Sequence, residues 1–474
     1  MKEGIILPKQ KGFSAILVLS IGALIGAMNI TMFNVAMPMM MTHFHASVST
    51  VQWLSSGYLL ATGIITPAAG YLGDRFGYNR IFNLTTLLVL LLSVVGTFSW
   101  CIESLIVVRF LFGLTAGLLA PLTMAMLYQA VPAVRQTQAV SFWGMATMLG
   151  GALPPCISGA ILNYADWRFL LLINVPLALL VLILSIRCLP KSPINADAKL
   201  DVSGLMLTSA GSLILLIAFS NLANWGFSPL FFLVAAVGAA CLILYVVKSL
   251  KRHDALLNLS ILKYPRYTAA FIADGITIIA MYMVTFVMPL FLQNALNLSP
   301  MVTGTIMLPG AFFTIIAMPL AGVINTKLGE RILAVTGVLC LVIGAVPFLH
   351  MTPAIPIVLV VAGMCVRSAG IGFMNLLTTN TQMSAIPQEL SGHASALTNW
   401  MRQMVGALIT SIASNIVGLR LAKSGAVTAE QTAAAYTSTT SFLMTISVIL
   451  TLLILPIALK YFRGRKTANV QAKA

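Results

Sequence analysis

Long apolar runs recur from one end of the chain to the other, separated by short polar or charged stretches. Each run has the roughly 20 residues that a helix needs to cross a hydrocarbon layer about 30 Å thick. Helices are expected because lipid offers backbone groups no hydrogen-bonding partner, and a β-barrel would show short alternating segments instead. The pattern predicts fourteen spans, near residues 13–36, 48–72, 81–99, 104–127, 138–163, 168–189, 203–222, 229–248, 267–293, 299–325, 332–350, 354–378, 392–419 and 437–460.

The composition places this pattern in a class of protein. Hydrophobic residues make up 59% of the chain, charged residues make up 8%, and the mean hydropathy is +0.98. A soluble domain usually carries about 25% charged residues, so we expect a multi-pass integral membrane protein. The net charge of +16 does not indicate a nucleic-acid partner, because the charge excess of a membrane protein mostly reports its topology.

Lysines and arginines are distributed unevenly over the loops. If both termini are cytoplasmic, only Arg168, Arg420 and Lys423 fall in outer segments, and nearly all the others lie on the cytoplasmic side. The opposite orientation would invert this bias, so the positive-inside rule predicts cytoplasmic termini. We therefore expect the protein in a bacterial cytoplasmic (inner) membrane, in contact with membrane lipid.

Short stretches of the sequence recur at a nearly constant offset. "PAAGYLGDRFG" begins at Pro67 and "PLAGVINTKLG" begins at Pro319, an offset of 252, and "GAL" at Gly151 returns at Gly406, an offset of 255. Internal repeats of this length are common in transporters. They predict an all-α membrane fold in which two six-helix halves flank an inserted helix pair. The expected division is 1–189 for the first half, 190–250 for the linker and inserted helices, and 251–474 for the second half.

A charged turn, "GYLGDRFGYNR" (Gly70–Arg80), separates two apolar runs on the cytoplasmic side. Its spacing resembles the signature loop of the major facilitator superfamily, commonly G-x-L-x-D-R-x-G-R-K-R, although Tyr78 and Asn79 replace two basic positions. The alternative is a solvated turn that only obeys the topology rule. The resemblance implies a cytoplasmic gate at the matching positions Gly70, Asp74, Arg75, Gly77 and Arg80.

Further stretches narrow the resemblance to one group of that superfamily. "RFLFGLTAGLLAP" (109–121), "WRFLLLINVP" (167–176) and "SALTNWMRQMVGAL" (395–408) look like the fourteen-helix drug:proton antiporters, closest to the lincomycin-resistance type. The resemblance implies proton-coupled export of small amphipathic compounds by a monomer, driven by the proton gradient without a cofactor. A proton-coupled importer or a metabolite exporter on the same fold is the alternative.

The sequence also departs from the pattern of this group. Many members carry an aspartate in the first span where this chain has Asn29, which cannot titrate. The antiporter motif of the fifth span usually reads G-P-x-x-G-G, whereas "LPPCISG" (153–159) replaces two of its glycines. Small residues and prolines still permit close packing and a bend. The residues of this antiporter-type motif are Gly151, Pro154, Pro155 and Gly159.

Two charged residues within the spans are the candidates for proton coupling. Asp274 is the only acid that falls well inside a span, roughly 10 Å deep at 1.5 Å per residue. A buried carboxyl that gains and loses a proton provides the cycle that a proton-driven carrier needs, although Asp274 could instead be the structural partner of an arginine. Arg109 matches the intramembrane arginine of the family, which implies proton transfer or a hydrogen-bond network. Its alternative is an arginine that extends to the outer interface.

Several polar side chains inside apolar helices could contact a substrate. Each could equally bond a neighbouring helix. The 25 methionines would suit an adaptable binding surface, or they could simply pack. The substrate-cavity candidates are Asn29, Asn34, Gln52, Asn375, Asn399 and Arg402.

A membrane-embedded enzyme is the remaining class. It would need clustered catalytic acids or a metal constellation near an interface, and the sequence shows neither. The six cysteines are scattered, mostly within apolar runs, and their spacing indicates no metal site and no disulfide framework. We therefore expect neither a metal nor an enzymatic reaction.

Overall fold

A computed structural model of the chain describes residues 9–131, 133–189, 194, 201–251, 257, 259–352, 354–387, 390–424 and 428–462. These residues form helices and contain no strand, so the all-α prediction is confirmed. Residues 9–189, here called the N-terminal bundle, contain α1 (Lys9–Thr31), α2 (Met37–His43), α3 (Val48–Val51), α4 (Trp53–Ile65), η1 (Thr66–Ala68), α5 (Ala69–Phe76), α6 (Tyr78–Thr97), α7 (Ile102–Ala130), α8 (Ala133–Ala152), α9 (Pro154–Tyr164), α10 (Arg168–Leu172) and α11 (Asn174–Cys188).

Two further groups of helices complete the chain. The inserted helices are α12 (Val202–Ser220), α13 (Leu222–Trp225) and α14 (Pro229–Lys251). Residues 259–462, here called the C-terminal bundle, contain η2 (Leu259–Lys263), α15 (Pro265–Asn294), α16 (Pro300–Leu328), α17 (Glu330–Leu349), α18 (Ile357–Ser384), α19 (Ser391–Ser424), α20 (Ala429–Leu452) and α21 (Ile454–Tyr461).

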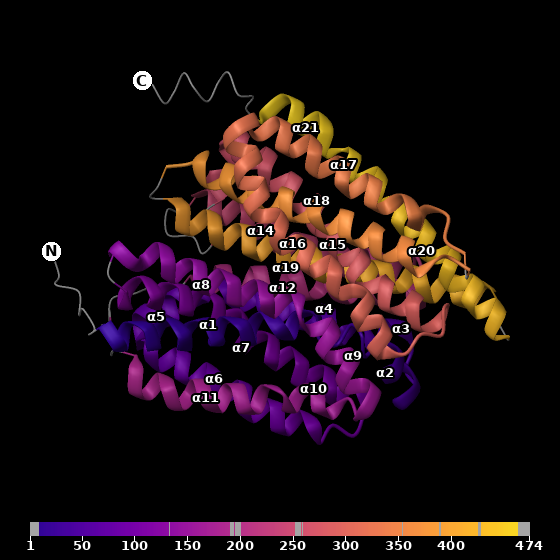
Figure 1. The fold of residues 1–474 in the computed structure, drawn as a ribbon, viewed down its shortest axis with the longest axis horizontal. Helices are drawn as coiled ribbons and strands as arrows, with labels where there is room; N and C mark the ends of the chain where they lie inside the picture. Colours follow the sequence, from indigo (N-terminus) through magenta and orange to yellow (C-terminus); the bar gives the residue numbers. More distant parts are fainter. Residues whose placement is uncertain are drawn as a thin grey trace.

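The two bundles lie side by side, with the indigo-to-magenta N-terminal bundle below the orange-to-yellow C-terminal bundle (Figure 1). In the N-terminal bundle, α1 packs on α7 and α8, α4 packs on α7, and α6 packs on α11. In the C-terminal bundle, α18 packs against both α16 and α17, while α15 packs against α18, α19 and α20. The inserted helix α12 packs on α14 and also contacts α4 and α19, so it reaches both bundles.

Local sequence explains where several helices begin and bend. Pro154 starts α9, where its missing N–H costs nothing, and the predicted span 138–163 is broken there, because α8 and α9 meet at 44°. Ser299 caps α16 by accepting a hydrogen bond from the Val302 N–H at 3.3 Å. Thr428 and Gln431 form a capping box at the start of α20.

The part of the chain that the structure describes contains fewer candidate membrane spans than the fourteen that the sequence predicts. Among the described residues, 11 helices are long and apolar enough to cross a membrane, or 12 if the bent pair of α8 and α9 is one span. The predicted spans 48–72 and 332–350 are helical but do not belong to this set. In the first of them the helix is divided into α3, α4, η1 and α5, which are individually short. The prediction of a multi-pass helical membrane protein is confirmed, whereas the count of fourteen stays a prediction.

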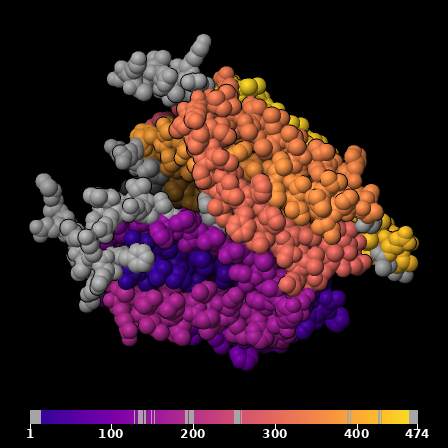
Figure 2. All heavy atoms as spheres, viewed as in Figure 1, coloured from indigo at the N-terminus to yellow at the C-terminus, as the bar shows by residue number. Residues whose placement is uncertain are grey.

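The bundles are joined at one end of the molecule. Among the described residues, two hydrogen bonds connect them: Gln293 donates to the Val35 carbonyl at 2.9 Å, and Ser411 donates to Gln52 Oε1 at 3.2 Å. Val35 and Gln52 lie in the connection between α1 and α4, whereas the charged turn comprises most of α5 and the start of α6, beyond the far end of α4. In Figure 2 the bundles meet on the right and are separated by a hollow on the left. The structure is therefore closed at the end opposite the charged turn.

Candidate transport cavity

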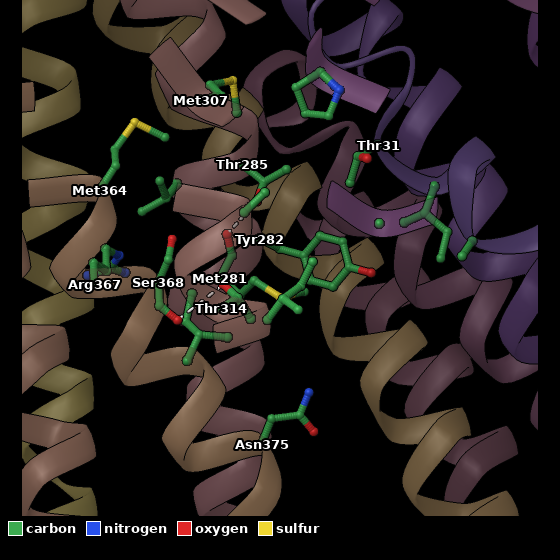
Figure 3. A pocket seen from close by; sticks show the side chains of 18 of the residues that line it. Thr31, Met281, Tyr282, Thr285, Met307, Thr314, Met364, Arg367, Ser368 and Asn375 are labelled. Carbon is green, nitrogen blue, oxygen red and sulfur yellow. Dashed lines mark hydrogen bonds between the residues drawn. The ribbon is translucent and has the colours of Figure 1, made fainter. Parts of the chain in front are cut away.

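A cavity of about 370 Å³ lies between the two bundles. Helices α1, α8 and α9 of the N-terminal bundle and α15, α16 and α18 of the C-terminal bundle form its wall. Figure 3 shows side chains of both bundles around this space. The described lining residues are Ala27, Ile30, Thr31, Thr147, Gly151, Pro155, Met281, Tyr282, Val284, Thr285, Met307, Ala311, Thr314, Ile315, Met318, Met364, Arg367, Ser368, Ile371 and Asn375.

The wall is mostly apolar, with scattered hydroxyl groups. Four methionines from three helices, Met281, Met307, Met318 and Met364, supply flexible and polarisable surface. Three of the six hydroxyls on the described wall, those of Thr147, Thr285 and Thr314, donate to backbone carbonyls of their own bundle. The described lining residues include no aspartate or glutamate. Such a wall can hold an amphipathic molecule by apolar contact and requires few hydrogen bonds at defined positions.

A buried ion pair lies next to this cavity. Asp274 on α15 accepts two hydrogen bonds from Arg402 on α19, from Nε to Oδ2 at 2.7 Å and from Nη2 to Oδ1 at 2.9 Å. Thr378 on α18 donates to the same carboxylate at 3.1 Å. The Asp274 side chain is 2% exposed, while that of Arg402 is 23% exposed. The two-point geometry makes this a strong, charge-assisted contact, and it connects three helices of one bundle.

Asn375 connects the ion pair to the cavity. Its Oδ1 accepts a hydrogen bond from Arg402 Nη2 at 3.2 Å, and its side chain lines the cavity. Figure 3 shows Asn375 at the lower edge of the space, on the same helix as Ser368 and Arg367. A change in the ion pair can therefore reach the cavity wall through one hydrogen bond.

Arg109 lies apart from that ion pair. Its side chain is fully buried, and it donates from Nε to the Leu54 carbonyl at 3.1 Å and from Nη2 to the Asn29 carbonyl at 2.9 Å. The rings of Phe33 and Tyr58 lie 4.4 Å from the guanidinium carbon. Arg109 thus ties α7 to α1 and α4 instead of extending to the interface, and no ion pair joins it to a described carboxylate.

Most of the predicted cavity candidates bond neighbouring helices instead. Asn29 exchanges hydrogen bonds with Asn174 on α11 at 2.8 and 3.2 Å, and both residues are fully buried. Asn34 accepts a hydrogen bond from Ser55 at 2.6 Å. Asn399 donates to Ser395, one turn earlier on its own helix. Of the six candidates, Asn375 alone is among the described lining residues.

Gln52 belongs to a network that holds the inserted helices. It donates to Ser220 at the end of α12 at 3.2 Å, Ser220 donates to Ser411 on α19 at 3.0 Å, and Ser411 donates back to Gln52. Asn415, one turn further along α19, donates to the Phe219 and Ser220 carbonyls. The inserted helices are therefore fastened to α19 at the closed end of the molecule.

The antiporter-type motif of the fifth span lies where the bundles approach most closely. Gly151 and Pro155 line the cavity. A Cβ on Gly159 would overlap the Pro300 carbonyl oxygen, and a Cβ on Gly304 would overlap the Pro155 carbonyl oxygen. The absence of these side chains lets the backbones of α9 and α16 touch and seals the cavity at the closed end.

The charged turn has no partner in the other bundle among the described residues. Asp74 is exposed and accepts a hydrogen bond from Tyr78 of the same turn at 3.0 Å. Arg75 and Arg80 form no ion pair with a described residue. Gly77 has φ +92°, a conformation that L side chains rarely adopt, and it separates α5 from α6. The role of the turn as a gate stays a prediction.

Sequence reasoning missed most of the cavity wall. The methionines were visible, but nothing in the pattern indicated which of the 25 face the space between the bundles. Tyr282, Thr285 and Thr314 occur in apolar helices with no distinguishing spacing. An alignment of the two halves of the chain could have indicated which helices face each other. The wall helices α1, α15, α16 and α18 lie where the two bundles meet.

Comparisons with known proteins agree with this architecture. Residues 19–410 match the sequence model of the Major Facilitator Superfamily. The chain is 28% identical over 404 residues to YhcA of Bacillus subtilis, an uncharacterised transporter of that type, covering 85% of this chain and 76% of the relative. It is 25% identical to the lincomycin resistance protein LmrB of Listeria monocytogenes, covering 83% and 84%. It is also 25% identical to the putative multidrug resistance protein MdtD of Salmonella typhi, covering 85% and 86%.

Solved structures show the same fold. The xylose transporter XylE of E. coli superposes with a TM-score of 0.64 at 15% identity, covering 97% of this chain and 99% of that chain. A bacterial homologue of the human lysosomal transporter Spinster superposes with a TM-score of 0.67 at 13% identity, covering 96% and 97%. This fold and family are those of a membrane transporter and not of an enzyme. The predicted family is confirmed: the chain belongs to the Major Facilitator Superfamily.

Proposed function

We propose that this protein exports amphipathic compounds from the cytoplasm by alternating access, driven by the proton gradient and without a cofactor. The single observation that carries the proposal is the cavity between the bundles with the buried Asp274–Arg402 ion pair beside it. The resistance named for relatives such as LmrB and MdtD supports drugs or toxic compounds as the substrates. Both termini would be cytoplasmic, in the inner membrane of a bacterium.

Proton binding to Asp274 would change the ion pair directly. The deprotonated carboxylate matches the two N–H groups of Arg402 at 2.7 and 2.9 Å. A protonated carboxyl carries no charge and can use at most one oxygen as a strong acceptor, so the two-point contact would be lost. Arg402 would then keep its hydrogen bonds to Asn375 and Thr379, both at 3.2 Å. One proton would therefore loosen α15 from α19 while α18 and α19 stay connected.

The position of Arg402 on α19 would spread this change across the molecule. Helix α19 packs on α4 of the other bundle, and its residue Ser411 holds Gln52 at the closed end. A displacement of α19 would strain that hydrogen bond and the contact with α4. Loosening of the ion pair at Arg402 is thus the proposed trigger for opening the closed end of the molecule, with the substrate carried in the cavity between the bundles.

The charged turn would act when the other end of the molecule, which is open in this structure, closes. In this structure, the end that carries Asp74 is open and Asp74 is exposed. We propose that Asp74 accepts hydrogen bonds from the facing bundle when that end closes, so that the gate is latched only in the outward-facing state. Thr326 and Lys327 occupy the corresponding place in the last turn of α16, so the second turn would lack this latch.

A susceptibility panel with an overexpressing and a deletion strain tests the export proposal. Lincomycin and a set of amphipathic dyes and antibiotics serve as probes. Overexpression of the wild type should raise resistance to some of them, and Asp274→Asn should remove that resistance. Asp166→Asn is the matched control, because Asp166 forms an exposed ion pair with Arg168 away from the cavity. Accumulation of the compounds by wild-type cells, instead of resistance, would favour an importer.

A further inference from the structure

Two arginines are buried inside the molecule with no carboxylate partner in the part of the chain that the structure describes. Arg109 is fully buried and Arg367 is 1% exposed. The four ion pairs among the described residues involve other residues: Arg168 with Asp166, Lys248 with Asp201, Arg266 with Glu330 and Arg402 with Asp274. A buried charge is costly unless it is compensated, so two unbalanced guanidinium groups are a feature that demands an explanation.

Arg367 lies at the cavity itself. Its Nη2 donates to the Ala280 carbonyl on α15 at 2.9 Å and to Ser447 Oγ on α20 at 2.8 Å, and its Nη1 donates to the Leu341 carbonyl at 3.4 Å. The next residues along each wall helix, Met281 and Ser368, line the cavity together with Arg367 (Figure 3). The guanidinium extends from α18 and is held by α15, α17 and α20, at the cavity wall.

The partners of Arg367 do not cancel its charge. They are two carbonyls and a hydroxyl, which are dipoles, and its Nε has no hydrogen-bond partner among the described residues. The other charged group beside the cavity, the Asp274–Arg402 pair, has no net charge. The described lining contains no acid. The cavity is thus exposed to one uncompensated positive charge in a region of low dielectric constant.

We infer that the cavity selects its substrates by charge: it binds anionic and neutral amphipathic compounds in preference to permanent cations of the same shape. Arg367 is the residue that determines this preference, acting through its field from behind the wall. At separations of 6–10 Å and an effective dielectric constant near 20, one charge changes the affinity for a monovalent ion by roughly tenfold or more. The inference rests on the proposed function only in taking this cavity as the binding site.

Equilibrium dialysis with purified full-length protein, without any ion gradient, tests the inference. The probes share a naphthalene ring and differ in charge: 2-naphthalenesulfonate, 2-naphthol and (2-naphthylmethyl)trimethylammonium. Near neutral pH they are an anion, a neutral molecule and a permanent cation. The wild type should bind the sulfonate about tenfold or more tightly than the trimethylammonium compound, with naphthol between them. Equal affinities, a preference for the cation, or binding of none of the three would overturn the inference.

Two variants assign the preference to Arg367. Arg367→Met should bring the affinities of the sulfonate and the cation together. If that variant does not fold, Ser368→Asp places a carboxylate on the wall beside the arginine and should likewise abolish the preference, because the two charges cancel. Arg420→Met is the control, because Arg420 packs on Phe442 and does not line the cavity. A preference that survives both substitutions would overturn the role of Arg367. Because no transport is measured, failure of export would leave these results unchanged.

Discussion

Gly77 and Gly329 lie 252 residues apart and share a positive φ of nearly the same value, +92° and +94°. Gly77 joins α5 to α6, and Gly329 joins α16 to α17. The offset equals the one between the two related stretches that begin at Pro67 and Pro319. The repeated sequence motif thus corresponds to a repeated structural element: a tight turn after α5 in the N-terminal bundle and after α16 in the C-terminal bundle.

This relationship predicts matched losses of stability. Gly77→Ala and Gly329→Ala should each lower the stability of the folded protein by about 1–3 kcal/mol, because alanine rarely adopts a φ near +90°. Gly418→Ala is the control, since a Cβ there meets open space on a helix and φ is not positive. Thermal unfolding of purified protein in detergent provides the measurement. Unchanged melting temperatures for both turn variants would contradict the conformational requirement.

The charged turn gives a second prediction. Asp74→Asn should reduce transport roughly tenfold, the effect of losing about 1.4 kcal/mol of latch stabilisation, while the amount of protein in the membrane stays normal. Tyr78→Phe is the comparison, because it removes only the hydrogen bond that Asp74 accepts in the open state and should leave transport largely intact. Wild-type transport by well-expressed Asp74→Asn protein would reduce the turn to a topological signal.

Close contact between α9 and α16 gives a third prediction. Gly159→Ala should weaken the closed end, because the added methyl group overlaps the Pro300 carbonyl oxygen. The population open at that end should rise, which can be followed by the labelling rate of a cysteine at Thr303, a buried residue at the start of α16. Gly322→Ala, with open space around its Cβ, should not change the rate. Slower or equal labelling in Gly159→Ala would show that the contact does not control closure.

Topology gives a fourth prediction. A cysteine that replaces the exposed Tyr164, the last residue of α9, should react with a membrane-impermeant reagent only from outside the cell. A cysteine that replaces Lys327, exposed at the end of α16, should react only from the cytoplasm. The six native cysteines are replaced first. Reaction of both from the same side would contradict the predicted orientation.

The sequence predicted the helical fold well because the membrane itself constrains the pattern. A long apolar run leaves the backbone one way to satisfy its hydrogen bonds, so helices such as α7 and α15 follow directly from composition. The glycine turns were also visible, because glycine adopts a φ near +90° at little cost and other residues rarely do. The sequence does not show where a spanning helix is divided, because the pieces keep their apolar character, as α4, η1 and α5 do.

The candidate site was predicted only in part, because contacts across the chain are not visible in spacing. Asp274 and Arg402 were both singled out, but their pairing joins residues 128 positions apart. From the sequence, Asn29 and Gln52 could contact a substrate or a neighbouring helix, and in the structure they bond Asn174 and Ser220. A polar residue in an apolar helix reveals that it needs a partner. It does not reveal whether the partner is a helix or a substrate.

Proton release on substrate binding tests the central claim most directly. The compound to which overexpression confers the greatest resistance is added to purified protein in a weakly buffered solution, and the pH of the solution is recorded. Wild type and the control Asp166→Asn should release protons when the compound binds, whereas Asp274→Asn should bind the compound and release none. Equal proton release by wild type and Asp274→Asn would contradict the account, because the coupling group would then lie outside the Asp274–Arg402 pair.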